Sequence, residues 1–158
     1  MTELINTISD LLRARHYIVA TAESCTGGMI ASAITDLAGS SAIFDRGFVT
    51  YSNEAKMDML GVSAETLAQH GAVSAETAHE MVVGALARSR AHIALSVTGI
   101  AGPSGGTTDK PVGLVYIGIG KKGGTISVSH HIFNGNRVAV RTQACTAALN
   151  AVLKLLEQ

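Results

Sequence analysis

The chain has 158 residues, of which 47% are hydrophobic and 15% charged, and its formal net charge is +0 at pH 7. This length fits a single domain over residues 1–158 and leaves no room for two domains of ordinary size. The neutral charge argues against direct nucleic-acid binding through a basic patch, because neutralising phosphates requires clustered Lys and Arg.

No segment approaches the roughly 20 consecutive apolar residues of a membrane helix, so we expect no contact with a membrane. The N-terminus lacks the basic and then apolar pattern of a signal peptide. Cys25 and Cys145 are too few and too far apart for a disulfide framework or a Cys-x-x-Cys site. These observations favour a cytoplasmic protein. The charged fraction is well below the roughly 25% of average soluble domains, and we therefore predict a homo-oligomer that covers part of its surface.

Apolar spacing and turn residues predict helices and strands in alternation along the first two thirds of the chain. We expect a helix over 3–15, a strand over 17–22, a helix over 29–37 and a strand over 44–51, in which Phe48 and Val49 suggest burial on both faces. Short helices capped by Asn53 and by Ser63 follow, and Ser74 is expected to cap a long helix that ends at Arg90.

The last third of the chain begins with a strand over 92–98 and continues with a long loop, 99–112, that is rich in Gly, Pro, Ser and Thr. Strands over 113–120 and 125–133 are joined by a Lys-Lys-Gly-Gly turn and predict a hairpin, and a helix over about 137–156 ends the chain. This order predicts an α/β fold, a three-layer α/β/α domain with a mixed, largely parallel sheet ending in a hairpin.

Three unusual segments directly follow predicted strands, namely residues 21–28, 50–56 and 98–106. In an open α/β sheet, ligands bind beyond the carboxyl ends of the strands. We therefore expect the three segments to meet at one edge of the sheet and to form the functional site.

Ser24 in the first segment precedes Gly27 and Gly28, which open a helix, and this order can expose a hydroxyl beside free backbone N–H groups. Such groups could hold an oxyanion or a phosphate. The alternative is a capping turn in which Ser24 and Thr26 satisfy only backbone donors. None of the six histidines offers an obvious base for Ser24, and none forms a metal-ligand cluster, so we expect no catalytic metal.

Lys56 in the second segment is the alternative base. A lysine is charged near neutral pH unless burial in a water-poor cleft lowers its pKa, and a Ser–Lys pair could then act as nucleophile and activator. The alternative is a solvated helix lysine. Cys25 is a rival nucleophile, but no basic cluster beside it suggests a lowered thiol pKa, and we interpret it as a small buried residue. Tyr51 could stack on a ring, hydrogen-bond the reacting centre or pack in the core.

The third segment contains Gly99, Gly102, Gly105 and Gly106, with a hydroxyl at Thr98. Glycines permit a close backbone approach to a ligand, so the loop predicts a phosphate or ribose site, although a mobile surface loop is the alternative. Lys110, further along the same loop, is a second cation that could neutralise a substrate phosphate.

Five motifs follow one another along the chain: Ala22-Glu23-Ser24-Cys25-Thr26-Gly27-Gly28, Tyr51-Ser52-Asn53 with Lys56, Gly71-Ala72-Val73-Ser74, Thr98-Gly99-Ile100-Ala101-Gly102-Pro103 and Lys110-Pro111-Val112-Gly113. Together they closely resemble the CinA C-terminal domain family. The match keeps order and spacing over nearly the whole chain. It resembles the form of the family that stands alone, without the nucleotide-pyrophosphatase domain of fused members. In one departure, Gly135-Asn136-Arg137 stands where the family often has Gly-Asp-Arg.

The resemblance implies an α/β/α domain that hydrolyses the carboxamide of nicotinamide mononucleotide, without a cofactor. It implies Ser24 as nucleophile, Lys56 as its activator and Tyr51 as an assisting residue. The implied substrate-binding residues are Thr26, Gly27, Gly28, Asn53, Thr98, Gly99, Gly102, Gly105, Gly106, Lys110, Arg137 and Arg141. The two arginines could instead be plain surface charges. Two other functions remain open: a nucleotide-binding module without turnover, and an interaction module related to competence or damage.

Overall fold

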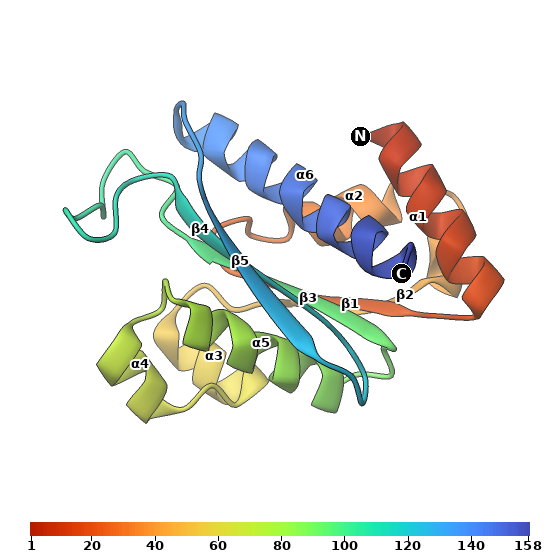
Figure 1. Cartoon of the computed structure of the whole chain (residues 1–158), viewed down its shortest axis with the longest axis horizontal. Helices are drawn as coiled ribbons and strands as arrows, with labels where there is room; N and C mark the ends of the chain where they lie inside the picture. The colour runs from red at the N-terminus through yellow and green to blue at the C-terminus, as the bar shows by residue number, and fades with distance from the viewer.

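The five strands form one mixed sheet in the order β2-β1-β3-β4-β5 in the computed structural model, which describes residues 1–158 (Figure 1). Their bounds are Val19–Glu23 for β1, Phe44–Val49 for β2, Ile93–Gly99 for β3, Leu114–Lys121 for β4 and Ile126–Ile132 for β5. β1 pairs in parallel with β2 and β3, while β3–β4 and β4–β5 are antiparallel. The predicted hairpin is confirmed, but the description of the sheet as largely parallel is loose, because only two of these four pairings are parallel.

Helices cover both faces of this sheet, which confirms the three-layer α/β/α architecture (Figure 1). One face is covered by α1 (Thr2–Arg15), α2 (Met29–Thr35) and α6 (Arg137–Leu156), and the other by α3 (Asn53–Leu60), α4 (Ala64–His70) and α5 (Ala75–Ala87). A single 3-10 turn, Ser40–Ala42, leads into β2. No helix is both long enough and apolar enough to span a membrane.

Each helix layer buries its own apolar cluster against the sheet. The larger cluster joins α1, α2 and α6 to the central strands, with Leu12, Ile30 and Leu149 among its members. The smaller cluster joins α3 and α5 to the other face, with Leu60 and Met81 at its centre. Because the central strand β3 is covered on both sides, all its residues up to Thr98 are buried.

Glycine lets the helices of the second layer approach each other closely. A Cβ at Gly84 of α5 would lie 1.9 Å from the carbonyl oxygen of Leu60, the last residue of α3. Only a residue without a side chain fits there. The contact fixes α3 against α5 and thereby fixes the helix that carries Lys56.

Two local predictions fail for reasons that lie outside the local sequence. β2 is an edge strand rather than one buried on both faces, and Val49 is 45% exposed because β2 has a neighbour only on the β1 side. The cap of α3 is Ser52, whose hydroxyl accepts from the Ala55 N–H at 3.0 Å, and Asn53 is the first helical residue. The caps Ser63 and Ser74 are confirmed, although α5 ends at Ala87 rather than Arg90.

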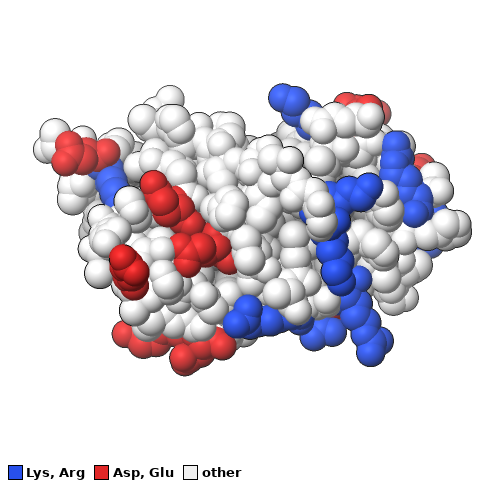
Figure 2. Space-filling view, turned by 60° about the horizontal axis from the view of Figure 1, so that its bottom comes forward, with Lys and Arg blue, Asp and Glu red and all other residues white.

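Most acidic side chains on the face shown in Figure 2 lie toward its left end and most basic ones toward its right end, with a basic group among the former and acidic groups among the latter. α5 follows this gradient, because Glu76 and Glu80 lie in its first half and Arg88 and Arg90 directly follow its end. The formal net charge of zero therefore results from acidic and basic groups that lie mostly in different regions of the surface.

Candidate active site

The side chains of Ser24 and Lys56 meet at the carboxyl end of β1. Lys56 Nζ lies 3.0 Å from Ser24 Oγ and donates a second hydrogen bond to the Thr50 carbonyl oxygen at 2.9 Å. Ser24 directly follows β1, and Lys56 lies on α3 behind the loop that leaves β2. β1 and β2 are parallel neighbours, so the loops that follow them emerge at the same edge of the sheet. The pair thus forms where two of the three predicted segments converge.

Lys56 is buried without a counterion. The residue is 1% exposed, and no carboxylate forms an ion pair with it. Burial lowers the pKa of the Lys56 ammonium from its ordinary value of 10.5, and the nearby Cys25 opposes this shift only in part. Because desolvation disfavours the charged form, the amine at this position is suited to accept a proton from the Ser24 hydroxyl.

The Ser24 loop, residues 24–28, makes a tight turn between β1 and α2. The Ser24 N–H donates to the Val97 carbonyl at 2.9 Å, and the Gly27 N–H donates back to the Ser24 carbonyl at 3.0 Å. Gly27 and Gly28 both have positive φ, at 58° and 99°, which explains why glycine occupies them. The amide of Gly27 is therefore engaged, contrary to the expectation that it is free. The amides of Cys25, Thr26 and Gly28 donate to no protein acceptor. Of these three residues only Cys25 lines the cleft described below, and Thr26 is 0% exposed.

Two charged residues hold the Ser24 loop, and sequence reasoning gave neither of them this role. The fully buried carboxylate of Glu23 accepts from the N–H groups of Ile30 and Ala31 at the start of α2. Arg141 on α6 donates to the carbonyl oxygens of Cys25 and Thr26. Glu23 stands beside Ser24 in the quoted motif, but only its burial and partners reveal its role.

A cleft with a volume of about 260 Å³ opens beside Ser24 and Lys56. Other predicted residues that line it are Tyr51, Thr98, Gly99, Gly102, Gly105 and Arg137. Ile100, Ala101 and Ser104 also line the cleft, and they lie in the segment 98–106 that was expected to form the site. Sequence reasoning gave no role to Ala72 and Val73, although both lie within a motif quoted above. The three predicted segments thus surround a single concave site, together with residues from the loop before α5 and from the start of α6.

Arg137 and Tyr51 meet at the mouth of this cleft. The Arg137 guanidinium donates to the Tyr51 hydroxyl at 2.9 Å and to the Gly102 carbonyl at 2.9 Å. Tyr51 is 61% exposed, so its ring is not a core residue. Arg137 therefore connects the segment after β2 to the loop after β3 and places a cation at the rim.

The remaining predicted binding residues do not line the cleft; they are Thr26, Gly27, Gly28, Asn53, Gly106, Lys110 and Arg141. Thr26 is fully buried, and its hydroxyl has no partner. Asn53 is exposed on α3. Lys110 instead donates to the His70 carbonyl at 2.6 Å, which holds the long loop against the end of α4.

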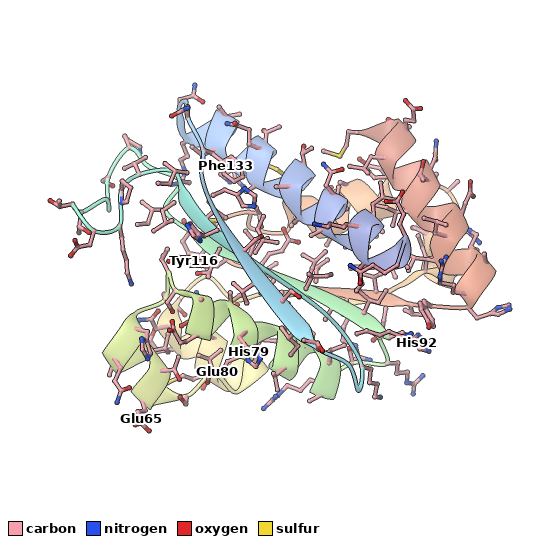
Figure 3. The ribbon with its side chains drawn as sticks, viewed as in Figure 1. Glu65, His79, Glu80, His92, Tyr116 and Phe133 are labelled. Carbon is pink, nitrogen blue, oxygen red and sulfur yellow. The ribbon has the colours of Figure 1, made fainter.

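Other potential catalytic groups lie away from Ser24 and Lys56 or are in the wrong protonation state for catalysis. Burial raises the pKa of the Cys25 thiol to about 11, so the thiol beside Ser24 stays protonated near neutral pH. No histidine lines the cleft. Figure 3 shows His79 on α5 and His92 at the start of β3, the end of the sheet opposite the loop of residues 99–112. No group of three or more His, Cys, Asp or Glu side chains is placed to hold a metal ion.

The chain is similar to known proteins over nearly its whole length. The family model of the CinA C-terminal domain matches residues 1–156. The nicotinamide-nucleotide amidohydrolase PncC of Enterobacter agglomerans is 53% identical over 152 residues, which cover 96% of this chain and 93% of that protein. The protein of the same name from Escherichia coli K12 is 52% identical, with 96% and 92% covered. The crystal structure of the competence/damage inducible protein CihA from Agrobacterium tumefaciens superposes with a TM-score of 0.94 at 49% identity, covering 99% of this chain and 94% of that one.

Proposed function

The chain belongs to the CinA C-terminal domain family, and from that premise we propose that it is an amidase that hydrolyses the carboxamide of nicotinamide mononucleotide to nicotinate mononucleotide and ammonia. The names of the relatives from Enterobacter agglomerans and Escherichia coli support the reaction. The observation that carries the mechanism is the buried Lys56–Ser24 hydrogen bond at the wall of the cleft.

The first half of the proposed reaction forms an acyl-enzyme. Neutral Lys56 accepts the proton of the Ser24 hydroxyl, and Oγ attacks the carboxamide carbon to give a tetrahedral intermediate. Preorganised N–H donors stabilise such an oxyanion, and the candidate is the unpartnered amide of Cys25, which follows Ser24 and lines the cleft. The Lys56 ammonium then returns the proton to the leaving nitrogen, the C–N bond breaks, and ammonia departs.

In the second half, water replaces ammonia. Neutral Lys56 takes a proton from a water molecule that attacks the acyl carbon, and the proton returns to Ser24 Oγ as the ester bond breaks. The same lysine therefore serves as base and then as acid in both halves. A lysine can do this near neutral pH only because its pKa is lowered, and the burial of Lys56 supplies that condition.

The lining of the cleft supports one placement of the nucleotide. The carboxamide would lie at Ser24, and the ribose would pass along Thr98, Gly99 and Gly102. Arg137 at the rim can reach a phosphate, because guanidinium groups bind phosphate with paired, charge-assisted hydrogen bonds. We further propose that residues 1–158 act as one cytoplasmic domain without a cofactor, assembled as a homo-oligomer.

Ammonia release from nicotinamide mononucleotide, run beside free nicotinamide with wild type and Ser24→Ala, tests the proposal. We expect release that is selective for the nucleotide and lost in the variant. Thermal stabilisation by the nucleotide without any release of ammonia would refute it and would favour the binding module instead.

A further inference from the structure

We propose that Glu23 and Arg141 are positioning residues that hold the Ser24 loop from two sides, so that the amide of Cys25 stays free to receive the oxyanion. This inference rests on the proposed amidase function and explains how the loop beside Ser24 is held in a form that can bind the oxyanion. Neither residue lines the cleft, so neither is expected to touch substrate.

Glu23 fixes the two ends of the Ser24 loop relative to each other. It is the last residue of β1 and is 0% exposed. Its Oε1 accepts from the Ile30 N–H at 2.9 Å and its Oε2 accepts from the Ala31 N–H at 3.0 Å. No Lys, Arg or His forms an ion pair with it, so these amides compensate the buried charge. The residue before Ser24 is thereby bound to the first turn of α2, which follows the loop.

Arg141 fixes the peptide planes within the loop. Its Nε donates to the Cys25 carbonyl at 3.0 Å and its Nη2 donates to the Thr26 carbonyl at 3.2 Å. In a trans peptide the C=O of one residue and the N–H of the next point in opposite directions. Holding the Thr26 carbonyl toward Arg141 therefore turns the Gly27 N–H away from Arg141, and this N–H donates to the Ser24 carbonyl.

The peptide plane between Ser24 and Cys25 is oriented by a hydrogen bond within the turn. The Ser24 carbonyl accepts from the Gly27 N–H, which turns the Cys25 N–H, in the same plane as that carbonyl, in the opposite direction. Cys25, the residue that follows Ser24 in the chain, lines the cleft. The unpartnered Cys25 amide is thus held through its own peptide plane, by the hydrogen bond from the Gly27 N–H that Arg141 helps to orient.

The alternative is that Arg141 is a phosphate ligand like Arg137, which lies one turn earlier on α6. The two roles predict different kinetics. A phosphate ligand contributes mainly to the KM of phosphorylated substrates, whereas a residue that orients oxyanion donors acts in the transition state and changes kcat.

The experiment compares Arg141→Ala, Arg141→Lys and the control Lys154→Ala, which removes an exposed cation from the same helix, with nicotinamide mononucleotide and its nucleoside as substrates. We expect Arg141→Ala to lower kcat about 100-fold on both substrates, with KM changed by less than about twofold. Arg141→Lys should lose less activity, since one ammonium can still donate to a carbonyl. Added guanidinium ion should restore part of the Arg141→Ala activity.

An increase in KM confined to the nucleotide, with kcat unchanged, would overturn the proposal and make Arg141 a phosphate ligand. Glu23→Gln provides a second test, because its amide NH2 would face a backbone N–H. It should lower kcat about tenfold at unchanged KM, and full activity in a folded Glu23→Gln protein would contradict the role of Glu23.

A substrate-independent measurement separates this inference from the proposed function. A fluorophosphonate forms a bond from Ser24 Oγ to phosphorus, fluoride leaves, and the hydroxyl proton passes to Lys56. If wild type hydrolyses no amide but is labelled at Ser24, the proposed function fails, and slower labelling of Arg141→Ala still supports the positioning role. Equal labelling rates, or no labelling of wild type, would overturn it.

Discussion

Lys56 Nζ and Ser24 Oγ lie 3.0 Å apart although 32 positions separate the two residues along the chain. One side chain comes from α3 and the other from the turn after β1. The amine is buried, and its partners are a hydroxyl and a backbone carbonyl rather than a carboxylate. This relationship turns a lysine, which is ordinarily a surface cation, into a candidate base.

Replacing the nucleophile should abolish turnover, while replacing its neighbour should not. We expect Ser24→Ala to lower kcat for nicotinamide mononucleotide by at least about 1,000-fold. Cys25→Ala should keep kcat within about threefold, because a thiol whose pKa is raised to about 11 is protonated at neutral pH. Ammonia release measures both. The opposite pattern would make Cys25 the nucleophile.

The rate should depend on pH through Lys56. Only the neutral amine can take the Ser24 proton, so kcat/KM should rise with pH and level off above the Lys56 pKa, which burial places below 10.5. Lys56→Arg, which stays charged throughout, should lose at least about 100-fold. An active Lys56→Arg enzyme would contradict the assignment.

Lys56 should cost the protein stability. Its pKa is lowered in the folded state, so between that pKa and about 10.4 the unfolded chain binds more protons and wild-type stability rises with pH. Lys56→Met should therefore have a higher Tm than wild type at pH 7, by about 2–4 °C per kcal/mol. The difference should shrink as the pH approaches 10. A lower Tm for Lys56→Met at pH 7 would mean that the hydrogen bonds of Lys56 outweigh its desolvation.

Arg137 should determine preference for the phosphorylated substrate. Its guanidinium lies at the cleft mouth between Tyr51 and Gly102. We expect Arg137→Ala to raise KM for the nucleotide about tenfold, with a smaller effect on the nucleoside. Steady-state kinetics with both substrates measure the difference, and Lys154→Ala on the same helix is the control. An equal loss on both substrates would place the phosphate elsewhere.

The close contact between α3 and α5 gives a prediction about stability. Gly84→Ala places a Cβ against the Leu60 carbonyl and should destabilise the fold by about 1–3 kcal/mol, although alanine has the higher helix propensity. Chemical denaturation measures the change. Val83→Ala on the exposed side of the same helix is the matched control and should be close to neutral. A stabilised Gly84→Ala protein would show that the helices can separate at little cost.

The sequence by itself determined those features that depend on neighbouring residues. The caps Ser63 and Ser74, the bounds of α6 and the hairpin follow from side-chain capping and turn chemistry within a few residues. The convergence of the three segments also followed, because loops after adjacent parallel strands emerge at the same edge.

The tertiary structure decided what depends on distant partners. It placed β2 at an edge, bound Lys110 to the His70 carbonyl, engaged the Gly27 amide and buried Glu23 at the start of α2. Strand order and hydrogen-bond partners join positions far apart in the chain, so no local pattern encodes them. The same holds for the Lys56 pKa: the residue type supplies an amine, but the fold buries it away from water and thereby lowers its pKa.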